Sequence, residues 1–179
     1  MTDQQPNPQV IHNALRSIPH AKFVLTCCHG EYRDGIITRW VQRCSSEPPM
    51  IVVAIPKGKM IEPMLRDARA FALCMVKEND RSVQRLFGSE HELGDDPFLS
   101  LSVHKSVNGM PILEQSLVWF DCKLEGHLSP DADCRLYLGQ VVAAHISKQH
   151  QDEIVVPPTS SKHKSILVRS IQTVQKFQQ

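Results

Sequence analysis

The chain has 179 residues, with 20 basic and 19 acidic side chains, a formal net charge of +1 and a pI near 7.7. This length favours one domain that buries a real hydrophobic core. No long block of like charge is present, which argues against nucleic acid as a partner, because phosphate binding normally leaves a clustered basic surface. No apolar run approaches the roughly 18 residues that a membrane-spanning helix needs, so we expect no membrane association.

The first half of the chain predicts one helix followed by strands. Residues 1–8 are predicted to be a disordered lead. Apolar residues from Val10 to Ile18 have helical spacing, and Pro19 ends this amphipathic segment. The expected elements that follow are a strand at 22–28, a turn at 31–35 in which Asp34-Gly35 suits positive φ, a long strand at 36–44, a break at 47–49 where two prolines remove ladder donors, and an apolar strand at 50–55 that is typical of burial on both faces.

The second half predicts a helix, a strand and a long hairpin. The expected elements are a helix at 60–68 with Pro63 in its first turn, a strand at 70–76, a short helix from Asp80 with Val83, Leu86 and Phe87 inward, an ambiguous turn-rich stretch at 88–114, and two long strands at 117–128 and 134–146 around Ser129-Pro130-Asp131. Several strands without regular βαβ alternation predict a mainly β domain with short helices, a barrel rather than a doubly wound sheet.

The cysteines and histidines do not indicate a redox or metal centre. The six cysteines have no CxxC spacing, and the polar N-terminus lacks the apolar core of a signal peptide, so reduced thiols in a cytoplasm are expected. Cys27 and Cys28 point to opposite faces of one strand, and their apolar surroundings favour unreactive thiols. The nine histidines show no HxxxH or HExxH pair, so no metal is expected. Neither GxSxG nor GxGxxG is present, which disfavours a serine hydrolase and a Rossmann domain.

Three stretches, taken together, have the order and spacing of one known family. Residues 34–49 are similar in length, and in their Ser-x-x-Pro-Pro ending, to a Gly-Met-Thr-Ala-Asn-Ser-Phe segment. Residues 71–76, Phe-Ala-Leu-Cys-Met-Val, resemble a Phe-Ala-Val-Asn-Val-Leu strand, and residues 136–141 resemble a Phe-Val-Gly-Glu-Val strand. The three segments to which these stretches are similar come from the flavin reductase-like family of FMN-binding split barrels, which the chain resembles from about Ala14 to Ile146.

The resemblance implies a Greek-key antiparallel split β-barrel over residues 9–150, and a homodimer with FMN near the subunit interface. A C-terminal extension at 151–179 would pack on the domain or on the other subunit. Many members of the family reduce flavin with NADH or NADPH, and others relay electrons from FMN to a partner protein. In either case the protein supplies orientation and ring electrostatics, so no catalytic acid or base is expected.

Two groups of residues are the candidate FMN site. Lys57-Gly58-Lys59 lies between a buried strand and a helix start, where backbone N–H groups and lysine charge suit a phosphate, and Ser45 aligns with a family serine near that phosphate. The alternatives are a solvated turn and a strand-end serine that satisfies the backbone. The segment that meets the isoalloxazine in the family contributes Thr38, Arg39, Trp40, Val41 and Cys44.

This segment departs from the family pattern at Arg39, where Asn is usual, and at Trp40, where Ser is usual. Arginine accepts no hydrogen bond, so it cannot copy every role of an asparagine. We hypothesise that its charge, near flavin N1 and C2=O, raises the reduction potential of the flavin. The alternatives are that Arg39 and Arg43 share a solvent-facing strand face, and that Trp40 is a core or interface residue.

A second departure concerns the nicotinamide. The family often has Asp-His-Thr before its Phe-Val-Gly-Glu-Val strand, whereas Asp133-Cys134-Arg135 stands here without a histidine. Three hypotheses therefore remain open. The first is an oxidoreductase that uses NADH or NADPH. The second is an FMN electron carrier without a nicotinamide site, and the third is a split-barrel binding module that has lost flavin.

Overall fold

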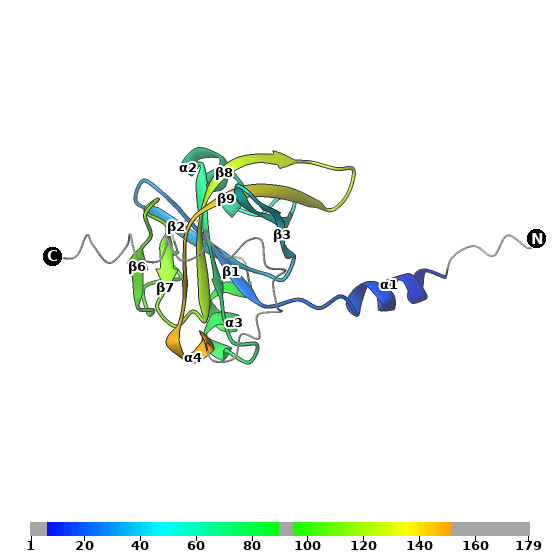
Figure 1. Ribbon diagram of the computed structural model, residues 1–179, viewed down its shortest axis with the longest axis horizontal. Helices are drawn as coiled ribbons and strands as arrows, with labels where there is room; N and C mark the ends of the chain where they lie inside the picture. Colours follow the sequence, from blue (N-terminus) through cyan, green and yellow to red (C-terminus); the bar gives the residue numbers. More distant parts are fainter. Residues whose placement is uncertain (1–6, 90–94, 152–179) are drawn as a thin grey trace, which may run out of the picture. The chain divides into compact units, whose positions relative to one another are not determined.

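The computed structural model describes residues 7–89 and 95–151. The chain divides into two compact units, Met1–Ser147 and Lys148–Gln179, and the described element of the second unit is the short helix α4 (Lys148–Gln151). The described elements of the first unit are α1 (Pro8–Arg16), β1 (Phe23–His29), β2 (Tyr32–Thr38), β3 (Val41–Ser46), β4 (Pro49–Pro56), α2 (Ile61–Ala68), β5 (Ala70–Met75), α3 (Arg81–Phe87), β6 (Val103–Lys105), β7 (Pro111–Leu113), β8 (Val118–Leu128) and β9 (Cys134–Ile146) (Figure 1).

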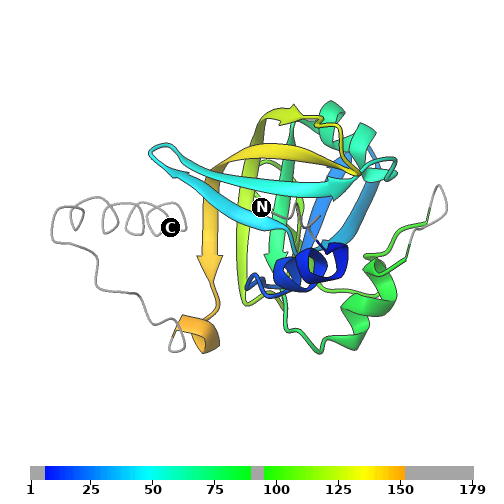
Figure 2. The same ribbon diagram turned by 90° about the vertical axis from the view of Figure 1, so that its right-hand side faces the viewer.

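The strands of the first unit form one large antiparallel sheet and one small one. The seven-stranded sheet has the order β2-β1-β5-β8-β9-β4-β3, and β6 pairs with β7. Figure 2 shows the strands of the large sheet curving around a common centre, so the prediction of a mainly β, antiparallel barrel is confirmed. Because β3 and β2 end the order, the sheet is an open barrel with two edges.

The core fills the inside of this curved sheet and is closed by α2. Leu25 of β1 and Leu73 of β5 are opposite each other in the ladder and fully buried. Ile61 and Leu65, one helical turn apart on α2, are fully buried as well. Burying each such side chain contributes about 1.5–3 kcal/mol, so the helix is held by its apolar stripe, as its sequence spacing predicts.

The predicted turn at 31–35 is wrong. Gly30 occupies the left-handed region with φ +62°, and β2 already begins at Tyr32. Gly35 is instead a strand residue opposite Thr26, and a Cβ on it would lie 2.9 Å from Cε1 of Phe87. Glycine is therefore needed at position 35 for close packing against α3, which the Asp-Gly pair alone does not reveal.

The predicted long strand at 36–44 is also corrected, because β2 ends at Thr38 and β3 begins at Val41. The apolar strand β4 is present, but it is not buried on both faces. Ile51, Val53 and Ile55 are buried, whereas the residues between them are partly exposed. Strand β4 therefore has one inner face that packs on the core, and the edge strand β3 lies beside it.

The helices and the hairpin of the second half are confirmed. Asp80 caps α3, accepting a hydrogen bond from the Val83 amide at 3.0 Å, and Val83 and Phe87 are buried. Strands β8 and β9 form the predicted hairpin. The ambiguous stretch at 88–114 contributes β6 and β7, whose connecting turn is anchored on the large sheet because the Asn108 amide donates to Asp121 at 2.9 Å.

The predicted N-terminal helix is present as α1, capped by Asn7, and all of its residues are exposed. Most of the predicted disordered lead and the C-terminal extension from residue 152 lie outside the described residues. Each helix in the described part of the chain is too short or too polar to span a lipid bilayer.

Candidate functional site

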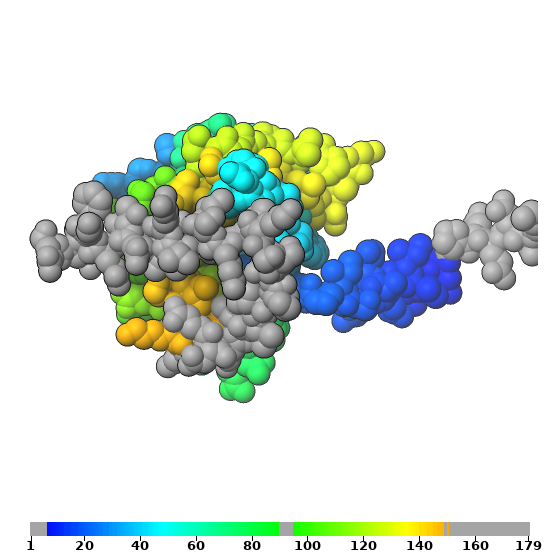
Figure 3. All heavy atoms as spheres, viewed as in Figure 1, coloured from blue at the N-terminus to red at the C-terminus, as the bar shows by residue number. Residues whose placement is uncertain are grey.

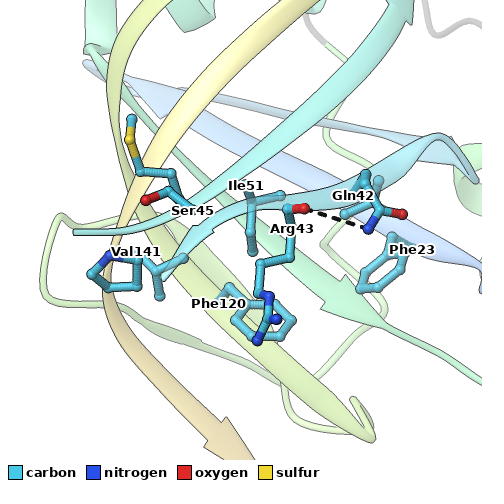
Figure 4. Close-up of a pocket in the computed structure, with 10 residues that line it drawn as sticks. Phe23, Gln42, Arg43, Ser45, Ile51, Phe120 and Val141 are labelled. Atoms are coloured by element: carbon cyan, nitrogen blue, oxygen red, sulfur yellow. Dashed lines mark hydrogen bonds between the residues drawn. The ribbon is translucent and has the colours of Figure 1, made fainter. Parts of the chain in front are cut away.

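A cavity of about 330 Å³ lies under the edge strand β3. Most of its lining comes from β3 and β4, and the back wall comes from β1, β8 and β9. The lining residues are Phe23, Val41, Gln42, Arg43, Ser45, Pro49, Met50, Ile51, Phe120 and Val141 (Figure 4). Two phenyl rings with aliphatic neighbours and a few polar groups at one side are typical of sites that bind small molecules, and the volume is at the lower end of their range.

The register of β3 explains which of its side chains reach the cavity. Arg43 pairs with Ile51 and Ser45 pairs with Met50, so the pairing shifts by one residue between them and Cys44 is the extra residue of a bulge. A bulge bends a strand and changes the direction of its side chains. Arg43 and Ser45 line the cavity, whereas Cys44 is exposed and does not. Figure 3 shows the β3–β4 hairpin (cyan) on the surface beside the β8–β9 hairpin (yellow).

The residues predicted to meet the flavin ring are only partly brought together. Val41 lines the cavity, but Thr38, Arg39 and Trp40 do not. Thr38 is buried at the end of β2, where its hydroxyl donates to the Ala54 carbonyl at 3.2 Å and accepts from the Trp40 amide at 3.3 Å. These two hydrogen bonds fix the backbone where β2 ends and β3 begins. The Trp40 side chain is 57% exposed, so it is not a core residue of this chain.

Arg39 forms a paired contact with Glu78. Its Nη1 donates to Oε2 of Glu78 at 2.8 Å, and Nη2 donates to Oε1. These hydrogen bonds lower the pKa of Glu78 and raise the pKa of Arg39. The carboxylate therefore compensates much of the charge that Arg39 would offer to a flavin. The hypothesis that Arg39 raises the reduction potential stays a prediction.

The loop Lys57-Gly58-Lys59 does not line the cavity. Gly58 adopts φ +84°, and its amide donates to Oε2 of Glu62 at 2.7 Å. Lys57 Nζ donates to the Pro130 carbonyl at 2.7 Å. The cavity touches β4 at Pro49–Ile51, whereas the loop follows its other end, roughly 20 Å away along an extended strand. The structure therefore separates Ser45 from the lysine loop, although both were predicted to hold the phosphate.

The residues that give the cavity its aromatic wall and its charge were not predicted from the sequence. Phe23 and Phe120 come from β1 and β8, far apart in the chain, and they meet because both strands pair with β5. No local motif marks either phenylalanine. Arg43 was considered only as a solvent-facing residue; it is exposed, as that alternative expects, and it also lines the cavity, five residues before Pro48.

Comparison with known proteins identifies the family. The model of the flavin reductase like domain matches residues 15–162, which is most of the chain. The chain belongs to this family. Two of its curated relatives are diflavin flavoproteins of Synechocystis sp. The chain is 30% identical over 128 residues to the member called A 2, covering 71% of this chain and 22% of the relative. It is 24% identical over 139 residues to Diflavin flavoprotein A 1, covering 77% and 24%. The flavin reductase-like chain thus spans about a quarter or less of these relatives.

Solved structures agree on the fold. A nitrilotriacetate monooxygenase component B homologue from Mycobacterium thermoresistibile has a TM-score of 0.70 at 19% identity, covering 79% of this chain and 76% of that one. An FMN-binding protein from Thermus thermophilus, solved with p-hydroxybenzaldehyde, has a TM-score of 0.69 at 21% identity, covering 83% and 82%. The expected split barrel is therefore confirmed, and the chain carries a flavin reductase like domain with this fold.

The residues of the cavity fit a flavin. Its two phenyl rings and aliphatic side chains present flat apolar surface, and Gln42, Arg43 and Ser45 present polar groups at the β3 side. Within the described residues, no group of three or more His, Cys, Asp or Glu side chains is placed to hold a metal ion.

Proposed function

We propose that this flavin reductase-like enzyme binds FMN in the cavity under β3 and transfers electrons through it. The proposal rests on one observation: a single cavity is lined by two aromatic side chains, Phe23 and Phe120, and has polar side chains on its β3 side. Bound FMN supplies hydride and single-electron chemistry that no amino-acid side chain has.

The side chains of the cavity bind and orient the ring rather than exchange protons with it. Phe23, Phe120 and Ile51 offer apolar contact that excludes water from one face of the ring. Gln42 offers hydrogen-bonding groups for its polar edge or for the ribityl chain. Correct positioning of a donor against the ring accounts for hydride transfer, so the proposal needs no general acid or base.

Filling the cavity tests this proposal. Ser45 lines the cavity and is half-buried, whereas Ser46, the next residue of β3, is exposed and does not line it. We expect Ser45→Trp to abolish FMN binding, measured by quenching of flavin fluorescence, and Ser46→Trp to bind FMN as the wild type does. Equal binding by the two variants, with native circular dichroism, would show that the flavin lies elsewhere. Absence of flavin binding in the wild type would favour a module that has lost FMN.

We propose NADH or NADPH as the electron donor. A second candidate function is an FMN carrier that takes electrons from a partner protein. One observation favours the carrier. The residues on either side of the position where the family has a histidine make hydrogen bonds within the fold, so they are not free to hold a nicotinamide. The Asp133 carbonyl accepts from the Lys57 amide at 2.8 Å, and Arg135 Nη1 donates to Glu62 at 2.5 Å. Stopped-flow mixing of the FMN-loaded protein with NADH and with NADPH separates the two functions. Rapid bleaching supports the reductase, and no bleaching with either donor supports the carrier.

We also propose that the 9–150 domain forms a homodimer in a reducing cytoplasm. The described helix α1 leaves its apolar side chains exposed, Val10 by 62% and Leu15 by 61%, and such a stripe is usually covered by a partner. All six cysteines are free, which suits a reducing compartment. Light scattering after size exclusion tests the dimer. We expect Leu15→Asp to yield monomers and Asn13→Asp, on the polar side of α1, to remain dimeric.

A further inference from the structure

The loop predicted to hold a phosphate already holds an anion that belongs to the chain. Glu62 lies in the first turn of α2, and its side chain is 6% exposed. Its Oε2 accepts the hydrogen bond from the Gly58 amide at 2.7 Å. A helix N-terminus and a glycine amide favour a negative group. The Glu62 carboxylate therefore occupies the position that a phosphate oxygen would take.

The other oxygen of this carboxylate is fixed by β9. Oε1 of Glu62 accepts from the Tyr137 hydroxyl at 2.8 Å and from Arg135 Nη1 at 2.5 Å. Burial raises the pKa of Tyr137, so the phenol remains a hydrogen-bond donor at neutral pH. Removing one partner of a buried ion pair is strongly destabilising. Glu62 is thus held in place, and a phosphate that approached Gly58 would meet its negative charge.

The cavity has a different charge pattern. Among its ten lining residues, Arg43 is the charged one. Figure 4 shows its side chain extending into the space beside Phe120, with Ser45 further along the same strand. No hydrogen bond or ion pair to another described residue engages the Arg43 guanidinium. Guanidinium groups bind phosphate through two parallel N–H bonds, and a neighbouring hydroxyl adds a third donor.

We infer that Arg43 binds the phosphate of the flavin, with Ser45 beside it, and that Glu62 excludes this phosphate from the Lys57–Lys59 loop. The inference rests on the proposed FMN function and assigns the selection of a phosphorylated flavin over riboflavin to Arg43. The phosphate then lies near the Pro49 end of β4 and not near its Pro56 end, where the lysine loop begins.

Comparison of FMN with riboflavin tests this assignment, because the two ligands differ only by the phosphate. Dissociation constants of the full chain are measured for both by quenching of flavin fluorescence. A charge-assisted hydrogen bond contributes enough that we expect Arg43→Gln to weaken FMN binding about 10- to 100-fold and riboflavin binding by less than about threefold. Arg43→Lys keeps the charge and is expected to retain part of the preference for FMN.

The matched control is Lys57→Gln with Lys59→Gln in one chain, which removes charge from the loop. We expect this double variant to bind FMN and riboflavin as the wild type does. Loss of FMN preference in the loop variant, with Arg43→Gln unchanged, would overturn the inference. An equal loss of both ligands in Arg43→Gln would also overturn it, because Arg43 would then act on the ring or on the fold.

Glu62 supplies an independent arm that involves no flavin. Glu62→Ala leaves the Gly58 amide without its acceptor and Arg135 without its counter-ion. We expect inorganic phosphate to raise the melting temperature of this variant more than it raises that of the wild type, because a free anion takes the vacated position. Equal phosphate effects on the two proteins would show that Glu62 is not a substitute for a phosphate. If neither FMN nor riboflavin binds the wild type, the proposed function fails, and this arm still reports on Glu62.

Discussion

The Phe71 ring of β5 packs directly on Gly139 of β9. A Cβ at position 139 would lie 2.5 Å from Cζ of Phe71 and 3.0 Å from Cβ of Cys122. Phe71 and Cys122 are fully buried, so neither can move aside into solvent. Glycine at this position lets β9 approach the interior of the barrel, next to the strand residues that form the back of the cavity.

Gly139→Ala is therefore expected to destabilise the fold by overpacking. Forcing an extra methyl group into a filled core costs about 1–3 kcal/mol. Urea unfolding followed by circular dichroism measures the change in the free energy of unfolding. The matched control is Gly126→Ala in the same hairpin, where a Cβ meets no atom within 4 Å. We expect this control to stay within about 0.5 kcal/mol of the wild type. Equal effects of the two substitutions would contradict the packing described here.

Three buried thiols predict a loss of stability at alkaline pH. Burial raises the pKa of Cys122 from 9.0 to about 12, and it also raises the pKa values of Cys27 and Cys74. Between pH 9 and the folded-state pKa, an unfolded thiol releases its proton while the folded one keeps it, so the unfolded state gains stability. Cys27 and Cys122 are each expected to lower the free energy of unfolding by about 1 kcal/mol between pH 9 and 10, and Cys74 acts in the same direction.

Urea titrations at several pH values between 7 and 10 measure this slope. Cys122→Ala removes one of the three thiols and is expected to flatten the alkaline limb, whereas Cys44→Ala, at an exposed position, is expected to leave it unchanged. A stability that is independent of pH up to 10 would refute the proposed protonation of the buried thiols.

Thiol labelling should single out Cys44. It is the exposed cysteine, on the outside of the β3 bulge, whereas Cys28 and Cys134 are half-buried and have raised pKa values. Because the thiolate is the reactive form, both burial and a raised pKa slow the reaction. Native protein treated with a chromogenic disulfide at pH 8 is expected to release one equivalent rapidly, and Cys44→Ser to release none in that phase. Rapid labelling of Cys27 or Cys122 in the folded protein would contradict the structure.

The helices were predicted correctly because they depend on residues that are close together in the chain. The apolar stripe of α2 and the Asp80 cap of α3 act within one turn of their own helix, so both were visible in the sequence. Gly35 was misinterpreted because its reason is tertiary. The ring of Phe87 comes from a helix roughly fifty residues later, and Gly30 forms the turn instead. The two three-residue strands β6 and β7 are too short to carry a periodic signal.

The candidate site was predicted only in its β3 part. Val41 and Ser45 line the cavity, but the aromatic wall depends on the order in which distant strands pair. The lysine loop has the composition of a phosphate cradle, and its internal carboxylate became apparent only once α2 and β9 were placed beside it. A glutamate four residues after the glycine is an ordinary helix-start residue in the sequence, because its two donors from β9 follow more than seventy residues later.

The structure of the full chain crystallised with FMN tests the central claim most directly. We predict that the isoalloxazine lies against Phe23 and Phe120 in the cavity under β3, that the phosphate is within hydrogen-bonding distance of the Arg43 guanidinium, and that Glu62 remains bonded to the Gly58 amide. An FMN whose ring lies outside this cavity, or whose phosphate sits on Lys57-Gly58-Lys59 with Glu62 displaced, would contradict the account.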